Sequence, residues 1–440
     1  MKKNALTLLL LLILSGSLPT MAQIRGNNIN VTVVPDHQDW NYKVGQTAQF
    51  TVSVTKSSTL LNNITVDFEA GPEMYPDVKK QDVVLKDGTM TWKGKMAKPG
   101  FYRLTVTAHV GGKDYKGSCT AAFSPELLQP TTVEPKDFDQ FWSRTLEEAR
   151  WTALNPQREL LPERSSESVN VYQVSFQNIR WGSRTYGILS VPTKPGKYPA
   201  LLRVPGAGVR PYSGDTYTAP GKAIVLEIGI HGVDVTQPQI FYDNLMNGAL
   251  NCYWDFGMDN RDRSYYKRVV VGCVRAVDYI ASLPEWDGKT IGVTGASQGG
   301  FLSYATAALD KRITFVAAVH PALCDLTASL QGVACGWPHY FYQMSNEKGE
   351  MRNEKDPQIK ARVETSRYYD GVNFVRRIQC PTWVSFGYND DVVPPTTAYA
   401  TYNTLNCEKT LSIYQQTAHF WYQEQWDEWQ DWMKERLITN

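Results

Sequence analysis

The stretch Ile291-Gly292-Val293-Thr294-Gly295-Ala296-Ser297-Gln298-Gly299-Gly300 decides the fold of this 440-residue chain. Its first residues predict a short apolar strand, and the alanine-rich continuation to Ala308 predicts a helix. Between them lies a Gly-x-Ser-x-Gly turn, where glycine is expected at 295 and 299 because a side chain at either position would clash. We therefore expect a sharp strand-to-helix turn that raises the Ser297 hydroxyl above the carboxyl edge of a sheet. An ordinary Gly-rich turn is the alternative.

A serine hydroxyl is a poor nucleophile at neutral pH and needs a histidine base that a carboxylate holds in the right tautomer. Three histidines follow Ser297 in the sequence: His320, His339 and His419. His419 lies between the last predicted strand and the last predicted helix, where a loop can place a base at the sheet edge. We predict that it is the base. His320, which follows the strand after the turn, and His339, in a Trp- and Tyr-rich segment, are predicted to be structural or to face substrate.

The carboxylate is expected in the loop after the preceding predicted strand, residues 381–387. That loop reads Tyr388-Asn389-Asp390-Asp391-Val392-Val393-Pro394-Pro395 and offers two adjacent carboxylates. Both cannot face the same histidine, so one of them is left as a helix cap or a solvated charge. We predict Asp390 as the acid and keep Asp391 as the alternative.

Two backbone N–H groups are candidates for binding a developing oxyanion. The helix that begins after Ser297 directs its free N–H groups at the site, and the N–H of Gln298 is the first of them. The second donor is expected from the loop after an early strand, which reads Pro205-Gly206-Ala207-Gly208. Proline has no N–H, so Ala207 is the candidate and Gly208 is the next choice. An ordinary loop is again the alternative.

Apolar strand-like runs alternate with helix-like runs from about residue 137 to the end of the chain. Alternation of this kind predicts a mostly parallel sheet flanked by helices. With the Ser, acid, His order, this pattern predicts an α/β-hydrolase fold. Asp137 is predicted to cap a helix that runs to about Arg150. The helical segments are 137–150, 265–283 and 421–438, and the strands are 186–191, 200–204, 223–228, 291–294, 315–319, 383–386 and 411–414.

The region before this alternation has a different pattern. From about Ile29 to Phe123, short segments with period-two alternation are separated by turns such as Asp87-Gly88 and Gly111-Gly112. This predicts an all-β, immunoglobulin-like sandwich over residues 23–125, ahead of a catalytic domain over 126–440. The sandwich has no cluster of catalytic residue types. It is expected to be a spacer or packing module, with carbohydrate binding or oligomerisation as the alternative.

Composition and the N-terminus limit the compartment and the partners. Residues 1–22 have the basic start, short apolar run and small residues of a cleavable signal peptide, so a periplasmic or extracellular location is expected. An uncleaved membrane anchor is the alternative. The 45 Lys and Arg nearly balance the 44 Asp and Glu, so we do not expect the chain to bind nucleic acid. Among the seven cysteines, Cys324 and Cys335 are a candidate disulfide or two buried thiols.

The chain from about Lys136 to Leu437 resembles the acetyl xylan esterase and cephalosporin C deacetylase family of carbohydrate esterases. The resemblance implies Ser297 as nucleophile, Asp390 as acid, His419 as base, and oxyanion donors at Gln298 and Ala207, with no metal or cofactor. The matching segments are Asp137-Phe138-Asp139-Gln140-Phe141-Trp142, Tyr265-Tyr266-Lys267-Arg268, Gly295-Ala296-Ser297-Gln298-Gly299-Gly300, Gly387-Tyr388-Asn389-Asp390, Pro394-Pro395 and His419.

The chain departs from the family pattern at three places. Pro205-Gly206-Ala207 stands where the family usually has His-Gly-Tyr, and Phe420 stands where it has Glu after the base. His231-Gly232-Val233 replaces Arg-Gly-Gln, which makes His231 a candidate substrate contact. The family forms hexamers, so a homo-oligomer is a candidate state, although the family's compact members lack the sandwich.

These observations predict a secreted serine esterase that removes acetyl groups from plant-type poly- or oligosaccharides. Two other readings stay open. A peptidase of the prolyl-oligopeptidase type shares the fold and the order of the triad, but it usually has an aromatic residue where this chain has Gln298. A non-catalytic glycan-binding protein would not need the Ser297, Asp390 and His419 set.

Overall fold

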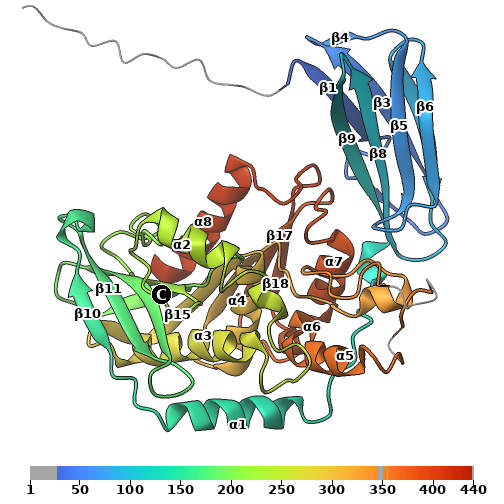
Figure 1. Ribbon diagram of the computed structural model, residues 1–440. Helices are drawn as coiled ribbons and strands as arrows, with labels where there is room; N and C mark the ends of the chain where they lie inside the picture. The colour runs from blue at the N-terminus through green and yellow to red at the C-terminus, as the bar shows by residue number, and fades with distance from the viewer. Residues whose placement is uncertain (1–26, 345–349, 354, 439–440) are drawn as a thin grey trace, which may run out of the picture.

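The computed structural model describes residues 27–344, 350–353 and 355–438 (Figure 1). The predicted signal peptide, residues 1–22, and the expected mature start near Gln23 lie outside these residues. Among the described helices, none combines the length and the apolar content that crossing a bilayer requires.

The N-terminal part is the predicted β-sandwich. Strand β3 shows why it forms, because every second side chain along Ala48, Phe50, Val52 and Val54 is fully buried in a core that belongs to this part of the chain. One sheet has the order β1-β3-β4, with β7 also paired to β3, and the other has the order β2-β9-β8-β5-β6. The strands are β1 Ile29–Pro35, β2 Asn41–Tyr42, β3 Thr47–Lys56, β4 Thr59–Leu60, β5 Ile64–Pro72, β6 Val78–Leu85, β7 Thr89–Lys95, β8 Gly100–Val110 and β9 Lys113–Phe123.

The second part contains a mixed sheet of order β10-β11-β12-β14-β13-β15-β16-β17-β18. Strands β13 to β18 pair in parallel, whereas β10, β11 and β12 pair in antiparallel fashion at one edge. The mostly parallel sheet is therefore confirmed. The edge strand β10 was not predicted because its four residues are all exposed and show no apolar period. The strands are β10 Gln157–Leu160, β11 Val169–Gln177, β12 Arg184–Pro192, β13 Tyr198–Arg203, β14 Ile224–Gly229, β15 Trp286–Ala296, β16 Phe315–Val319, β17 Thr382–Phe386 and β18 Lys409–Ile413.

Helices cover both faces of this sheet, as Figure 1 shows for α3 and α8 on opposite sides. Helix α8 buries Trp429, Met433 and Leu437 against one face, and α3 and α4 pack on the other with the larger core. The helices are α1 Phe138–Arg150, α2 Gln239–Asn247, α3 Tyr265–Ser282, α4 Gln298–Leu309, α5 Lys360–Ser366, α6 Gly371–Val375, α7 Pro395–Thr404 and α8 Gln423–Ile438, with 3-10 turns at Pro125–Leu127, Pro162–Arg164, Tyr253–Asp255, Ala328–Gln331 and Arg367–Tyr369.

The structure differs from the predicted helix cap at Asp137 and decides the state of Cys324 and Cys335. Asp137 does precede α1, but its side chain makes no capping hydrogen bond. It binds Arg261 and Tyr368 instead, because a guanidinium is a stronger partner for a carboxylate than a backbone N–H. Cys324 and Cys335 are both buried free thiols rather than a disulfide.

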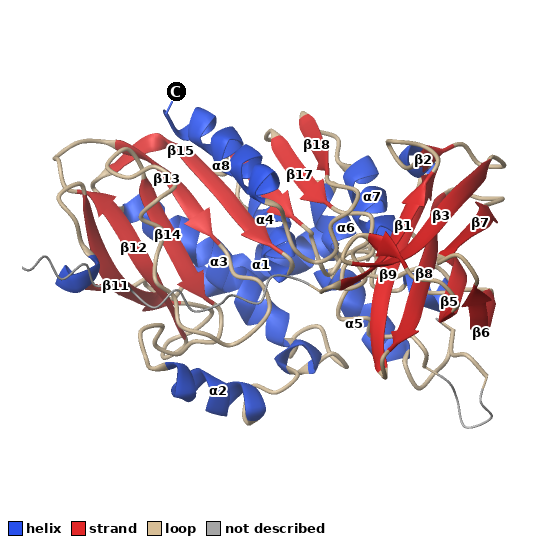
Figure 2. Cartoon of the chain, turned by 90° about the horizontal axis from the view of Figure 1, so that it is seen from above, coloured by secondary structure: helices blue, strands red, loops and turns tan. Residues whose placement is uncertain are grey.

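The sandwich lies beside helix α7, at the end of the sheet that contains β17 and β18, as seen from above in Figure 2. Phe101 and Ala122 of the sandwich belong to the core of the second part rather than to that of their own. Phe101 packs edge-on against Tyr388, with ring centroids 5.1 Å apart. The two parts therefore share buried apolar surface.

Candidate active site

Ser297 occupies the sharp turn between β15 and α4. Its backbone angles, φ 60° and ψ −124°, are strained for a residue with a side chain. A Cβ on Gly295 or on Gly299 would lie 2.5 Å from the carbonyl oxygen of Val204 on the neighbouring strand. Backbone cannot give way at that distance, so the turn requires glycine at both positions, as the sequence predicted.

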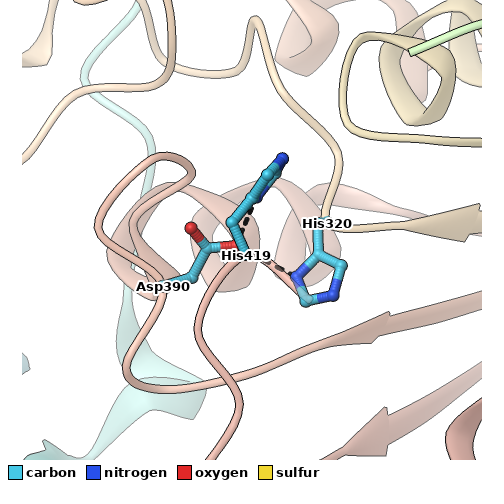
Figure 3. A group of neighbouring side chains, drawn as sticks. All are labelled: His320, Asp390 and His419. Atoms are coloured by element: carbon cyan, nitrogen blue, oxygen red, sulfur yellow. Dashed lines mark hydrogen bonds and ion pairs between the residues drawn. The ribbon is translucent and has the colours of Figure 1, made fainter. Parts of the chain in front are cut away.

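The structure brings Asp390 and His419 together, as Figure 3 shows. His419 Nδ1 donates to Asp390 Oδ2 over 2.8 Å, and this leaves Nε2 as the nitrogen available to a serine hydroxyl. Asp390 Oδ1 accepts the N–H groups of Val392 and Val393 in its own loop. The carboxylate of Asp390 is fully buried, whereas Asp391 is exposed to solvent. Of the two candidate acids, only Asp390 faces the histidine.

A second histidine touches the same carboxylate. His320 Nδ1 lies 3.0 Å from Asp390 Oδ2, and the ring is almost completely buried. Burial alone would raise the pKa of Asp390, but its contacts with His320 and His419 outweigh burial and hold that pKa well below its usual range. Asp390 is therefore ionised at neutral pH. This contact was not predicted from the sequence, although a signal for it was present, since His320 follows a parallel strand at the same sheet edge.

Backbone hydrogen bonds place the serine near this pair. The N–H of Ser297 donates to the carbonyl of Val319 over 2.8 Å, and Val319 directly precedes His320. The rings of His320 and His419 are 5.4 Å apart. Ser297 and His320 therefore lie at the carboxyl ends of neighbouring parallel strands, with the ring of His419 beside that of His320.

The two segments that carry the predicted oxyanion donors are in contact. A Cβ on Gly206 would come within 3.9 Å of the Ser297 Cβ, so the 205–208 loop borders the serine. The N–H of Gly208 is already used, because it donates to the hydroxyl of Tyr253 over 3.2 Å. Among the described residues no acceptor is hydrogen-bonded to the N–H of Ala207 or of Gln298. This distinction favours Ala207 over Gly208 as the second donor.

The side chain of Gln298 joins the turn to this loop. Its Nε2 donates to the carbonyl of Pro205 over 3.2 Å, and its Oε1 accepts hydrogen bonds from the hydroxyls of Tyr253 and Tyr266. The side chain is completely buried. Gln298 thus offers its N–H at the site while its side chain holds the loop that carries Ala207.

His231 lies after β14, one strand further along the same edge. Its Nε2 is 3.0 Å from the carbonyl oxygen of Gly208, and its Nδ1 is 2.8 Å from the hydroxyl of Tyr265. A carbonyl oxygen only accepts, so Nε2 carries the proton and Nδ1 accepts from Tyr265. Burial, together with the charges of Arg268 and Arg210, lowers the pKa of His231 to about 4. His231 is neutral at physiological pH and is not a substitute for a fixed cation.

His320, Asp390 and His419 also have the chemistry of metal ligands, and their ligand atoms lie within 4.8 Å of one another. Asp390 Oδ2 is already engaged by His419 over a hydrogen-bonding distance. A cation and the Nδ1 proton of His419 would compete for that one oxygen, so metal binding and the hydrogen bond to His419 exclude each other. The short contact favours the hydrogen-bonded arrangement.

A serine on a strained strand-to-helix turn, followed in the chain by a buried carboxylate and a histidine bound to it, is the arrangement of an α/β-hydrolase. The mostly parallel sheet with helices on both faces gives the same class. Comparison with known proteins then narrows the class to a family.

The family model for acetyl xylan esterase matches residues 126–436. The chain is 40% identical over 386 residues to the acetyl esterase Axe7A of Xylanibacter ruminicola, covering 86% of this chain and 84% of that protein. Solved acetyl xylan esterases from Paenibacillus sp. R4 and Thermoanaerobacterium sp. JW/SL YS485 align with TM-scores of 0.61 and 0.59, at 26% and 25% identity. Each alignment covers 71% of this chain, and 98% and 97% of the solved chains, respectively.

The chain therefore belongs to the acetyl xylan esterase family, and it is a carbohydrate acetyl esterase by class. This confirms the predicted family, the α/β-hydrolase fold and the assignment to ester hydrolases.

Proposed function

We propose that the protein removes acetyl groups from plant-type poly- or oligosaccharides through an acyl-enzyme on Ser297. The observation that carries the proposal is the 2.8 Å bond between His419 Nδ1 and the buried, ionised Asp390, at the sheet edge where Ser297 stands. The carboxylate fixes the tautomer of His419, so that Nε2 can take the hydroxyl proton of Ser297.

The proposed reaction has two halves. Ser297 attacks the ester carbonyl, and the N–H groups of Gln298 and Ala207 stabilise the oxyanion. His419 returns its proton to the departing sugar hydroxyl. Water, deprotonated by His419, releases acetate from the acyl-enzyme in the second half of the cycle.

Ser297→Ala tests the nucleophile directly. We expect acetate release from acetylated xylan fragments to fall by about 10,000-fold or more, because the members of a triad act as a unit. The measurement uses p-nitrophenyl acetate as well as acetylated xylan, pectin and mannan fragments. Ser282→Ala, which removes a hydroxyl from the end of α3, is the matched control. Near-normal turnover by Ser297→Ala would refute the nucleophile.

The same assay separates the two competing functions. Cleavage of aminoacyl-proline amides in preference to acetyl esters would support the peptidase. A wild-type protein that binds glycans but does not react with an organophosphate would support a non-catalytic binding protein. Retention of Gln298, with its buried contacts to the oxyanion loop, favours the esterase.

We assign a substrate contact to His231. It lines a hollow of about 610 Å³ together with Arg180, Arg184 and Arg268, and none of the described residues that line it is a carboxylate. The guanidinium of Arg184 is already bound to Ser175 and to the carbonyl of Asn155, so Arg180 and Arg268 are the cations of the hollow. Two cations without an acid favour a sugar that carries a carboxylate. The complete lining is Arg180, Trp181, Gly182, Ser183, Arg184, His231, Gly232, Leu250, Tyr265 and Arg268.

Arg180→Ala tests the ligand class of the hollow. Arg180 is exposed at the tip of the turn between β11 and β12, so its replacement should leave the fold intact. We expect KM to rise several-fold for acetylated xylo-oligosaccharides that bear a uronic acid and to stay constant for those without one. Arg263→Ala, which removes an exposed arginine elsewhere, is the control. Equal KM changes for both substrates would contradict the assignment.

The proposal also includes export to the periplasm or the extracellular space, supported by the signal-peptide pattern of residues 1–22. A homo-oligomer is the corresponding proposal for assembly. Light scattering on the purified chain measures it, and a monomer at micromolar concentration would rule it out.

A further inference from the structure

The β-sandwich contacts the segment that carries Asp390. Segment 388–396 runs from the end of β17 to the start of α7, and four side chains and one backbone carbonyl of the sandwich are hydrogen-bonded to it. No catalytic pattern in the sandwich predicted this, because the bonded residues lie 269 to 347 positions apart in the sequence. The side chains are those of Asn41, Glu73, Arg103 and Thr120, and the carbonyl is that of Ser118.

Arg103 lies at the centre of these contacts. Its Nη2 is 2.9 Å from the carbonyl oxygen of Asp390 and 3.3 Å from that of Tyr388. The same nitrogen is 2.7 Å from Glu73 Oε1. The side chains of Arg103 and Glu73 are only 16% and 1% exposed, so water does not compete strongly for these bonds.

Glu73 extends the contact to the beginning of α7. Its Oε2 accepts from the hydroxyl of Thr396 over 2.8 Å and from the Thr396 N–H over 3.3 Å. One carboxylate therefore orients Arg103 with one oxygen and holds the far end of segment 388–396 with the other.

A second chain of bonds reaches the loop of the base. Arg103 Nε donates to the hydroxyl of Thr120, which donates to Asn389 Oδ1 over 3.0 Å. The Nδ2 of Asn389 lies 3.3 Å from the carbonyl oxygens of Ser118 and of Gln416. Asn389 thus connects the sandwich with the loop that leads to His419.

We propose that Arg103 of the β-sandwich is a positioning residue for the carboxylate of Asp390. Its guanidinium holds the Asp390 carbonyl, and the loop that this fixes supplies the two N–H groups bound to Asp390 Oδ1. With Oδ1 held in this way, Oδ2 is directed at His419. The sandwich is then part of the esterase machinery rather than a spacer. This inference rests on the role proposed above for Asp390.

The test compares Arg103→Ala, Arg103→Lys and Thr120→Val with the full-length wild type on p-nitrophenyl acetate. We expect kcat of Arg103→Ala to fall about 10- to 100-fold with KM nearly unchanged, because a displaced acid misorients the base without altering substrate contacts. Arg103→Lys should recover part of kcat through its remaining charge, and Thr120→Val should lower kcat less. Lys79→Ala removes an exposed ion pair of the same sandwich and is the control expected to match wild type.

A double variant distinguishes positioning from general destabilisation. If Arg103 acts only by positioning the Asp390 carboxylate, Arg103→Lys should cause no further loss of kcat in a protein that already carries Asp390→Asn. Equal losses in both backgrounds, or wild-type kcat in all three sandwich variants, would overturn the inference. If Arg103→Ala does not fold, Arg103→Lys and Thr120→Val decide the question. Full activity of Asp390→Asn alone would instead overturn the proposed acid.

Discussion

At the scale of single residues, the site depends on how buried groups are partnered. Asp390 is fully buried and still ionised because His320 and His419 both face its Oδ2. His231 is neutral because desolvation and the charges of Arg268 and Arg210 lower its pKa to about 4, although its bond to the Gly208 carbonyl acts in the opposite direction. The charge state of a poorly solvated group is thus set by the charges and hydrogen-bond partners around it.

The depressed pKa of His231 predicts a pH dependence of stability. The unfolded chain binds a proton at this residue below about pH 6.5, whereas the folded chain does so only near pH 4. Between these values the unfolded state binds more protons, so the free energy of unfolding should fall as pH drops, by roughly 3 kcal/mol at most. Urea unfolding of wild type and His231→Gln at pH 7.5 and 4.5 measures the effect.

His231→Gln is the suitable comparison because glutamine can donate to Gly208 and accept from Tyr265 but does not titrate. Its stability should decline less between the two pH values than that of wild type. Parallel declines in both proteins would show that His231 does not contribute to the pH dependence.

At the scale of elements, the site depends on loops that lie in contact at one end of the sheet. The loop after β17 carries Asp390, and the loop after β18 carries His419. The N–H of Asn389 donates to the carbonyl of Thr417 over 3.2 Å, and that of Tyr388 donates to Gln415 over 3.1 Å. Close backbone approach therefore sets the separation of acid and base.

Gly387→Ala should disrupt this approach. A Cβ at Gly387 would lie 2.0 Å from the carbonyl oxygen of Thr417, so one of the two loops must shift. We expect a loss of roughly 1–3 kcal/mol in stability and at least about 100-fold in kcat, since a shift of about 1 Å is enough to misalign a triad. Steady-state kinetics and thermal unfolding measure both.

Gly196→Ala is the matched control for this prediction. Its new Cβ would approach only the flexible end of Tyr198, at 3.0 Å. Unchanged kcat in Gly387→Ala would mean that the two loops move together without altering the acid and base.

At the scale of the whole molecule, the two parts share core and polar contacts. Phe101 packs against Tyr388 and Tyr399, and the Arg103–Glu73 pair is buried between the sandwich and the loop of Asp390. Separation of the sandwich from the second part would expose apolar rings and leave a buried charge without its partners, and both effects are unfavourable in free energy. The parts are therefore expected to unfold together.

Scanning calorimetry should accordingly give one transition, with agreement between the calorimetric and van't Hoff enthalpies. Phe101→Ala removes the ring at the centre of the shared core and should separate the melting of the two parts. Two well-resolved transitions in the wild type would contradict the expected coupling.

The sequence alone was enough to determine the class and the family, and it predicted the principal site residues. The pattern around Ser297 requires a sharp turn because glycine on both sides has a steric cause, and that cause acts within a few residues of the chain. The order of Ser297, Asp390 and His419 along alternating strands and helices places them at one sheet edge by topology alone.

The tertiary structure decided what depends on distant contacts. It placed Asp390 rather than Asp391 against His419, and it gave the N–H of Gly208 a partner in Tyr253. It also placed His320 against Asp390, lowered the pKa of His231 and gave Asp137 a guanidinium as its partner in place of the expected cap. It also brought Arg103 to the loop of Asp390, across 287 residues of sequence. These outcomes follow from burial and hydrogen-bond geometry, which no local pattern encodes because the partners come from separate elements.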